Sequence, residues 1–81
     1  MIFLIEYNRR DRQLATFRVF GESDWQAAQD ERLKLEVNLN RRGVKHEVVL
    51  LQAETEAALR KTHRRYFEDL AQLTSPLFLP A

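Results

Sequence analysis

The 81-residue sequence contains no cysteine, and it has only two glycines and two prolines. Without a thiol, the chain can form neither disulfides nor thiolate metal sites, and it has no cysteine nucleophile. Its isolated glycines, Gly21 and Gly43, cannot make the glycine-rich loop that holds phosphates in nucleotide-binding folds. The absence of cysteine is typical of a reducing compartment, so we expect a cytoplasmic protein.

Long hydrophobic runs are also missing. The apolar start, residues 1–5, is stopped by Glu6 and has no basic segment before it, so we expect neither a signal peptide nor a membrane span. A net charge of +1 gives no overall attraction to nucleic acid or to anionic lipid, so such binding would need a local cluster. The content of 44% hydrophobic and 31% charged residues is typical of one globular domain.

Three segments have the composition of β-strands. Residues 2–7 and 13–20 are rich in β-branched and aromatic side chains, and the second segment alternates clearly. The polar residues 8–12 lie between them and include turn formers, which predicts a short antiparallel hairpin. Residues 45–52 predict a third strand that is apolar on both faces.

Two helices are predicted from their end signals. Ser23 lies three residues before Gln26, the spacing of a capping box, and Gly43 predicts a left-handed C-terminus, so the first helix spans about 23–42. Thr55 predicts the N-cap of the second helix, which we expect to run to about residue 73. The predicted apolar stripe of this second helix consists of Leu59, His63, Tyr66, Leu70 and Leu73.

One segment fits two interpretations. Leu33, Leu35, Val37 and Leu39 alternate with polar residues, which is the period of a half-buried strand. Under that interpretation the chain is a tandem β-β-α duplication. However, no glycine, proline or turn cluster precedes Leu33, and a helix cannot become a strand without a connection. A single long helix is therefore favoured.

The order strand, strand, helix, strand, helix predicts one α+β domain over residues 1–73, followed by an apolar, proline-flanked tail over residues 74–81. Short right-handed connections favour a three-stranded, mainly antiparallel sheet of order 2-1-3 with both helices on one face. We expect the helices to cover the sheet face that holds Phe3, Ile5, Tyr7, Ala15, Phe17 and Val19.

The second sheet face is then too apolar to remain in water. It is expected to hold Ile2, Leu4, Leu14 and Phe20, joined either by Val48 and Leu50 or by Val49 and Leu51. A contiguous apolar patch usually marks an interface. The leading hypothesis is a small non-enzymatic interaction module, a homodimer or a binder of another protein, unless the tail covers this face. The candidate interface residues are Ile2, Leu4, Leu14, Phe20, Leu77, Phe78 and Leu79.

The predicted topology also collects basic residues at one end of the molecule. The alternative function is therefore a nucleic-acid or anionic-ligand binder that uses a basic pole formed by the 8–12 and 41–45 loops. The candidate anion-binding residues are Arg9, Arg10, Arg12, Arg41, Arg42 and Lys45. A plainer interpretation is that these side chains are solvated or stabilise a helix C-terminus, and the low net charge does not favour nucleic acid.

Few residues point to catalysis. His63 and Tyr66 lie one turn apart on the second predicted helix and support a weak enzyme hypothesis. A core histidine that hydrogen-bonds a neighbour is the plainer interpretation, because no carboxylate or nucleophile stands at a recognisable spacing from His63. His46 and His63 belong to no metal-ligand motif. We therefore expect no enzyme activity, no metal and no cofactor.

Overall fold

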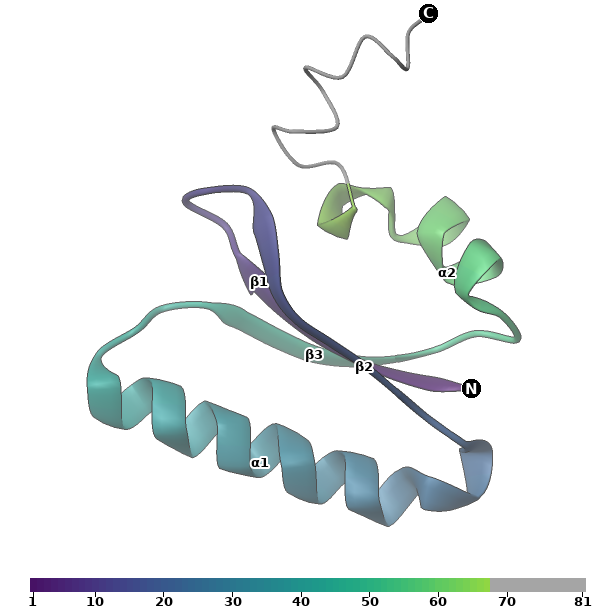
Figure 1. Ribbon diagram of the computed structural model, residues 1–81, viewed down its shortest axis with the longest axis horizontal. Helices are drawn as coiled ribbons and strands as arrows, with labels where there is room; N and C mark the ends of the chain where they lie inside the picture. The colour runs from purple at the N-terminus through teal and green to yellow at the C-terminus, as the bar shows by residue number, and fades with distance from the viewer. Residues whose placement is uncertain (68–81) are drawn as a thin grey trace, which may run out of the picture.

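The computed structural model of the chain describes residues 1–67. Its central strand, β1 (Ile2–Asn8), pairs antiparallel with both β2 (Gln13–Phe20) and β3 (Glu47–Gln52), as Figure 1 shows. A 3-10 turn (Glu22–Asp24) and α1 (Trp25–Arg42) connect β2 to β3, and α2 (Glu56–Thr62) follows β3. The predicted α+β class, the sheet order 2-1-3 and the two helices are confirmed.

Residues 33–40 are helical, so the tandem β-β-α interpretation is wrong. Their alternation has a different meaning on a helix of about 3.6 residues per turn. Leu35 and Leu39 lie one turn apart on the side that faces the sheet, and Leu33 and Val37 lie one turn apart on the opposite side. Leu39 is accordingly buried, whereas Leu33 is 60% exposed.

The predicted C-terminus of α1 and N-terminus of α2 are confirmed. Gly43 adopts φ 68°, and the Val44 N–H donates to the Leu39 carbonyl at 2.9 Å, which closes the end of α1. The Thr55 hydroxyl oxygen accepts a hydrogen bond from the Ala58 N–H at 3.0 Å and caps α2.

The predicted capping box at the start of α1 is wrong. Ser23 lies inside the 3-10 turn, and within residues 1–67 no side chain caps the start of α1 at Asp24. The Asp24 N–H instead donates to the Gly21 carbonyl at 2.9 Å. The backbone turn therefore takes the place of the side-chain cap.

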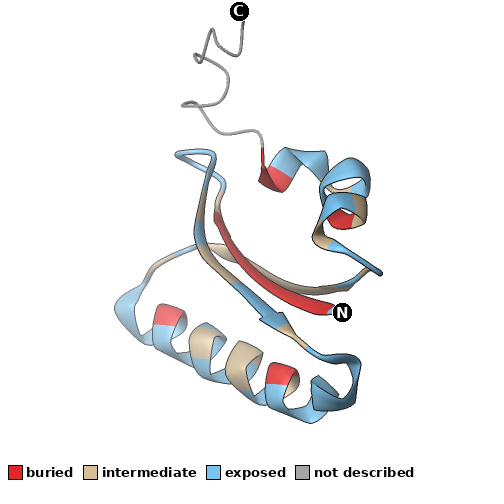
Figure 2. Cartoon of the chain, turned by 45° about the vertical axis from the view of Figure 1, so that its right-hand side comes forward, coloured by how far each residue is buried: buried red, intermediate tan, exposed pale blue. Residues whose placement is uncertain are grey.

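The two helices lie on opposite faces of the sheet, so the expectation that both cover one face is wrong (Figures 1 and 2). α1 lies against the face of Leu4, where Arg18 of β2 pairs with Glu31 of α1 at 2.8 Å. The general preference for right-handed crossovers favours one face for α1 in the β2–α1–β3 unit, but it does not apply to α2, which follows the last strand. Because β1 is apolar on both sides, each face gains by being covered, and Figure 2 shows buried β1 between the two helices.

The face under α2 holds the main aromatic cluster. Tyr66 lies edge-on against Tyr7 with ring centroids 5.2 Å apart, and Phe67 lies edge-on against Phe17 at 5.7 Å. The buried members of this cluster are Phe3, Ile5, Tyr7, Leu59, Tyr66 and Phe67.

The second helix is shorter than predicted, because α2 ends at Thr62 and a 3-10 turn (Arg64–Tyr66) follows. Tyr66 and Phe67, which follow the end of α2, are both buried. Leu70 and Leu73 of the predicted stripe lie outside the described residues.

A β-bulge moves Leu14 to the opposite face from the one predicted. Glu6 pairs with Thr16, but Tyr7 pairs with Leu14, so Ala15 is an extra residue in β2. Leu14 consequently packs against the aromatic cluster beneath α2. The register of β3 places Val48 and Leu50, rather than Val49 and Leu51, on the face of Leu4 that α1 covers.

Candidate anion-binding site

The sheet face that was predicted as an interface is already covered within one chain. Ile2 and Leu4 are 0% and 1% exposed, because α1 packs over them. Leu14 has moved to the other face, and Phe20 is half-buried with the Arg18 guanidinium 5.2 Å from its ring centroid. The remaining candidates, Leu77, Phe78 and Leu79, lie outside the described residues.

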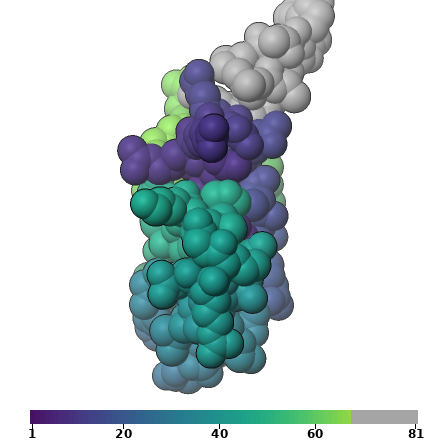
Figure 3. Space-filling view, turned by 90° about the vertical axis from the view of Figure 1, so that its left-hand side faces the viewer, coloured from purple at the N-terminus to yellow at the C-terminus, as the bar shows by residue number. Residues whose placement is uncertain are grey.

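The two basic loops, by contrast, do come together. They line one hollow of about 670 Å³. We call this the basic hollow. Its lining residues are Asn8, Arg10, Asp11, Gly43, Val44, Lys45 and His46. Figure 3 views this end of the molecule, with the purple hairpin above the teal end of α1.

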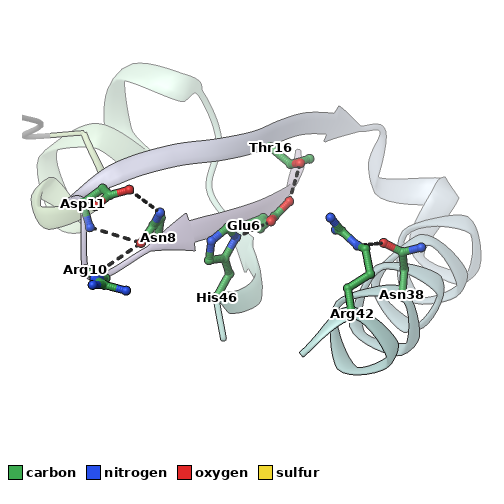
Figure 4. Close-up of polar contacts among 8 residues, drawn as sticks. All are labelled: Glu6, Asn8, Arg10, Asp11, Thr16, Asn38, Arg42 and His46. Carbon is green, nitrogen blue, oxygen red and sulfur yellow. Dashed lines mark hydrogen bonds and ion pairs between the residues drawn. The ribbon is translucent and has the colours of Figure 1, made fainter. Parts of the chain in front are cut away.

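Asn8 shapes the hairpin side of the basic hollow. Its Oδ1 accepts hydrogen bonds from the backbone N–H groups of Arg10 at 3.0 Å and Asp11 at 3.1 Å (Figure 4). Its Nδ2 donates to Asp11 Oδ2 at 2.9 Å, so the one carboxylate that lines the hollow is engaged by the loop itself. Arg12 closes the turn with φ 58°, a left-handed conformation common at such positions.

A buried carboxylate lies behind the hollow. Glu6, in the centre of the sheet, is only 6% exposed, and its Oε2 lies 2.5 Å from His46 Nδ1 (Figure 4). The Thr16 hydroxyl donates to Glu6 Oε1 at 2.7 Å. Burial raises the pKa of Glu6, but the hydrogen bonds from His46 and Thr16 and the nearby positive charges of His46 and Arg42 outweigh burial and lower it.

The Glu6 contact determines how His46 faces the hollow. An ionised carboxylate only accepts hydrogen bonds, so His46 Nδ1 carries the proton that is donated to Glu6. Nε2 is then the ring nitrogen through which His46 can contact a ligand in the basic hollow. The arrangement is a carboxylate that orients a histidine, as in many binding sites.

The structure separates the six predicted basic residues into two groups. Only Arg10 and Lys45 line the basic hollow. Arg9 lies near enough to Glu47 to help lower the pKa of that carboxyl, after the hydrogen bonds from Tyr66 and Arg65, and Arg12 is exposed.

The last two predicted residues belong to α1. Arg42 Nε donates to Asn38 Oδ1 at 2.9 Å, and its charge acts on Glu6 (Figure 4). Arg41 lines a different hollow, on the outward side of α1.

Sequence reasoning did not select Asn8, His46 or Glu6 for this site. Asn8 was predicted only as a turn former. His46 follows Lys45 in a connecting loop, and this position could have predicted that His46 lies at the basic pole. Glu6 gave a weaker signal, as a lone charge inside an apolar strand.

The side chains of the predicted pair His63 and Tyr66 make no direct hydrogen bond within residues 1–67: only the Tyr66 backbone N–H donates to the His63 carbonyl, at 3.3 Å, and the ring centroids are 6.4 Å apart. The Tyr66 hydroxyl instead donates to Glu47 Oε2 at 2.6 Å. Burial, followed by this hydrogen bond, raises the pKa of Tyr66, which does not favour proton transfer near neutral pH. His63 is half-buried at the C-terminus of α2.

Two kinds of feature, a metal-binding cluster and a membrane-spanning helix, are absent from the described part of the chain. Across residues 1–67, no three histidine, aspartate or glutamate side chains gather as a group that could hold a metal ion. Neither helix in this range has the length and apolar composition needed to cross a membrane.

Comparisons with known proteins do not add to this site. No protein-family model, curated protein or solved structure matches the chain. Its function is therefore inferred from the chemistry of the basic hollow.

Proposed function

We propose that this protein is a small, non-enzymatic binding module that holds phosphate-type anions in the basic hollow. The observation that supports the proposal is the convergence of two basic loops, far apart in sequence, on one concavity. A concave site with a few convergent polar groups is the usual form of a ligand site. The alternative, an interaction through the sheet face, is not favoured, because α1 covers Ile2 and Leu4 and a partner cannot contact them.

The charges within the hollow support an anionic ligand. The Arg10 guanidinium and the Lys45 ammonium make no hydrogen bond or ion pair with any residue in 1–67, so both groups can contact a ligand without breaking an existing pair. The opposing carboxylate, Asp11, is held by Asn8. Arginine and lysine are the side chains that most often bind phosphate.

Charge is also distributed unevenly along the molecule. The end opposite the hollow carries Glu22 and Asp24 before α1 and Glu54 and Glu56 around the start of α2. The N-terminal ammonium joins this acidic end, 3.2 Å from Glu22 Oε2. A net charge of +1 therefore conceals a field that steers anions toward the basic hollow.

The lining of the hollow indicates what part of a ligand is recognised. Histidine is the only ring-bearing residue type in it, so it lacks the aromatic platform on which bases stack. We therefore propose recognition of phosphate groups without a preference for base sequence. The phosphate can belong to a small molecule or to a nucleic-acid backbone.

The test is an amide NMR titration of the full chain at low salt, with inorganic phosphate and with a short single-stranded DNA. We expect shifts at residues 8–11 and 43–46, and loss of these shifts in the Arg10→Ala/Lys45→Ala variant. The control variant, Lys34→Gln/Lys61→Gln, removes the same charge from exposed positions elsewhere and should keep the shifts. Shifts with both probes assign the site to phosphate itself, and shifts with DNA only assign it to a polyanion. No shift in either loop with either probe rejects the proposal.

A further inference from the structure

The outward side of α1 exposes two large apolar side chains on consecutive turns. Leu33 is 60% exposed and Val37 is 43% exposed. Both lie on the side of the helix that faces away from the sheet. They border a shallow hollow of about 390 Å³ that is lined by Leu33, Lys34, Val37, Asn38 and Arg41.

Four residues of this lining have the spacing of a hole in helix–helix packing. Lys34, Val37, Asn38 and Arg41 stand at positions i, i+3, i+4 and i+7. In coiled-coil packing, four residues at this spacing surround one apolar side chain of the facing helix. The hole lies on the flank of α1 beside Leu33 and Val37, because Lys34 and Asn38 also line the hollow between α1 and the sheet.

We propose that α1 pairs with α1 of a second copy, antiparallel and about a two-fold axis, with Leu33 of each copy packed against Val37 of the other. If the axis passes at the level of Leu35, Leu33 lies opposite the partner's Val37. The contact is isologous, so every interaction occurs twice. This pairing is independent of the anion-binding proposal.

Charge complementarity supports a second copy as the occupant. In the same register, Asp30 lies opposite the partner's Arg41, on the flank of the helix that also carries the hole. Asp30 and Arg41 are both exposed within one chain, and the only described partner of Asp30 in residues 1–67 is the Gln26 amide. The two-fold axis brings these opposite charges together twice. A surface that binds an unrelated partner has no need for charges that complement one another in this way.

The pairing is expected to be reversible. α1 has 18 residues, and a contact made by one helix of this length is smaller than the standard interface of roughly 1,600 Å² between stable partners. We therefore expect a monomer–dimer equilibrium that responds to protein concentration. Sedimentation equilibrium from low micromolar to millimolar concentration measures it directly.

The first test replaces the most exposed apolar side chain of the contact. We expect Leu33→Asp to be monomeric at all these concentrations, with the circular dichroism of the parent protein, because Leu33 is exposed within one chain. The matched control is Val19→Asp, which changes a similarly exposed apolar residue on β2 and should leave the dimer intact. A parent protein that is monomeric throughout, or a Leu33→Asp variant that still dimerises, overturns the proposal.

The second test uses the symmetry of the charge pair. Asp30→Arg and Arg41→Asp should each weaken the homodimer, because each creates two like-charge contacts across the axis. Mixing the Asp30→Arg chain with the Arg41→Asp chain should give a heterodimer, since both contacts are then between opposite charges. The double variant Asp30→Arg/Arg41→Asp should recover the homodimer. Failure of both the mixture and the double variant to associate overturns the antiparallel register.

Discussion

Glu6 and His46 stand 40 positions apart in the sequence, yet His46 Nδ1 lies 2.5 Å from Glu6 Oε2. The contact joins the centre of the sheet to the loop that lines the basic hollow. It gives a buried carboxylate a partner and at the same time orients a ring at the hollow. Stability and the proposed ligand binding therefore depend on the same pair.

Glu6→Gln should destabilise the fold by about 1–3 kcal/mol near neutral pH, since it removes a charged acceptor from two hydrogen bonds. The pKa of Glu6 is lowered in the folded protein, so its contribution is fully present above the ordinary glutamate range. That contribution is lost as pH falls through the lowered pKa. Urea unfolding measures the free energy of unfolding of the parent and of Glu6→Gln, and the difference between the two should become smaller at acid pH.

The control for this prediction is Glu54→Gln, which changes an exposed carboxyl at the other end of the molecule. Its unfolding free energy should follow that of the parent protein at every pH. A gap for Glu6→Gln that stays constant from neutral to acid pH would contradict the assigned role of the carboxylate.

Leu59→Ala should destabilise the protein by about 2–5 kcal/mol, because Leu59 is fully buried in the cluster beneath α2. Leu33→Ala, at an exposed position, should change stability by less than about 0.5 kcal/mol when measured in the dilute monomer. Thermal or urea unfolding at low protein concentration compares the two. Equal losses would show that α2 is not packed as described.

Gly43→Ala should cost about 1 kcal/mol, because φ 68° is strained for a residue with a Cβ. No atom of the described chain lies within 4 Å of the added carbon, so the cost is one of backbone conformation. Gly21→Ala is the control: its φ is −67°, and its Cβ would meet Asp24 at an ordinary 3.5 Å. A larger loss for Gly21→Ala than for Gly43→Ala would exclude this explanation.

Binding of single-stranded DNA should weaken as salt rises, because phosphate contacts release counterions. Arg10→Ala and Lys45→Ala should each reduce the slope of log affinity against log salt by about 0.7, the value for one lost contact to a single strand. Arg41→Ala should leave the slope unchanged, since Arg41 lies outside the basic hollow. Fluorescence anisotropy over a series of salt concentrations provides the measurement.

Local features of the fold could be predicted because their signals lie in neighbouring residues. Gly43 marks the end of α1 and Thr55 the start of α2, and both signals depend on a few consecutive positions. The strand order followed as well, since a right-handed connection between β2 and β3 and an apolar β1 leave few arrangements. The meeting of the two basic loops at one end is a direct consequence of that order.

Other features were decided only by tertiary structure. β1 is apolar on both faces, so its composition does not say which face α2 covers. One bulged residue, Ala15, moved Leu14 across the sheet. The second helix ended at Thr62, before the buried Tyr66 and Phe67.

The sequence by itself determined the elements, their order and the basic pole. Tertiary packing decided which surfaces remained exposed. α1 buried Ile2 and Leu4, two residues of the expected interface, and left Leu33 and Val37 facing outward. The physical reason is that an alternating apolar pattern on a helix supplies two opposite faces, and only contact with the sheet selects the one that is buried.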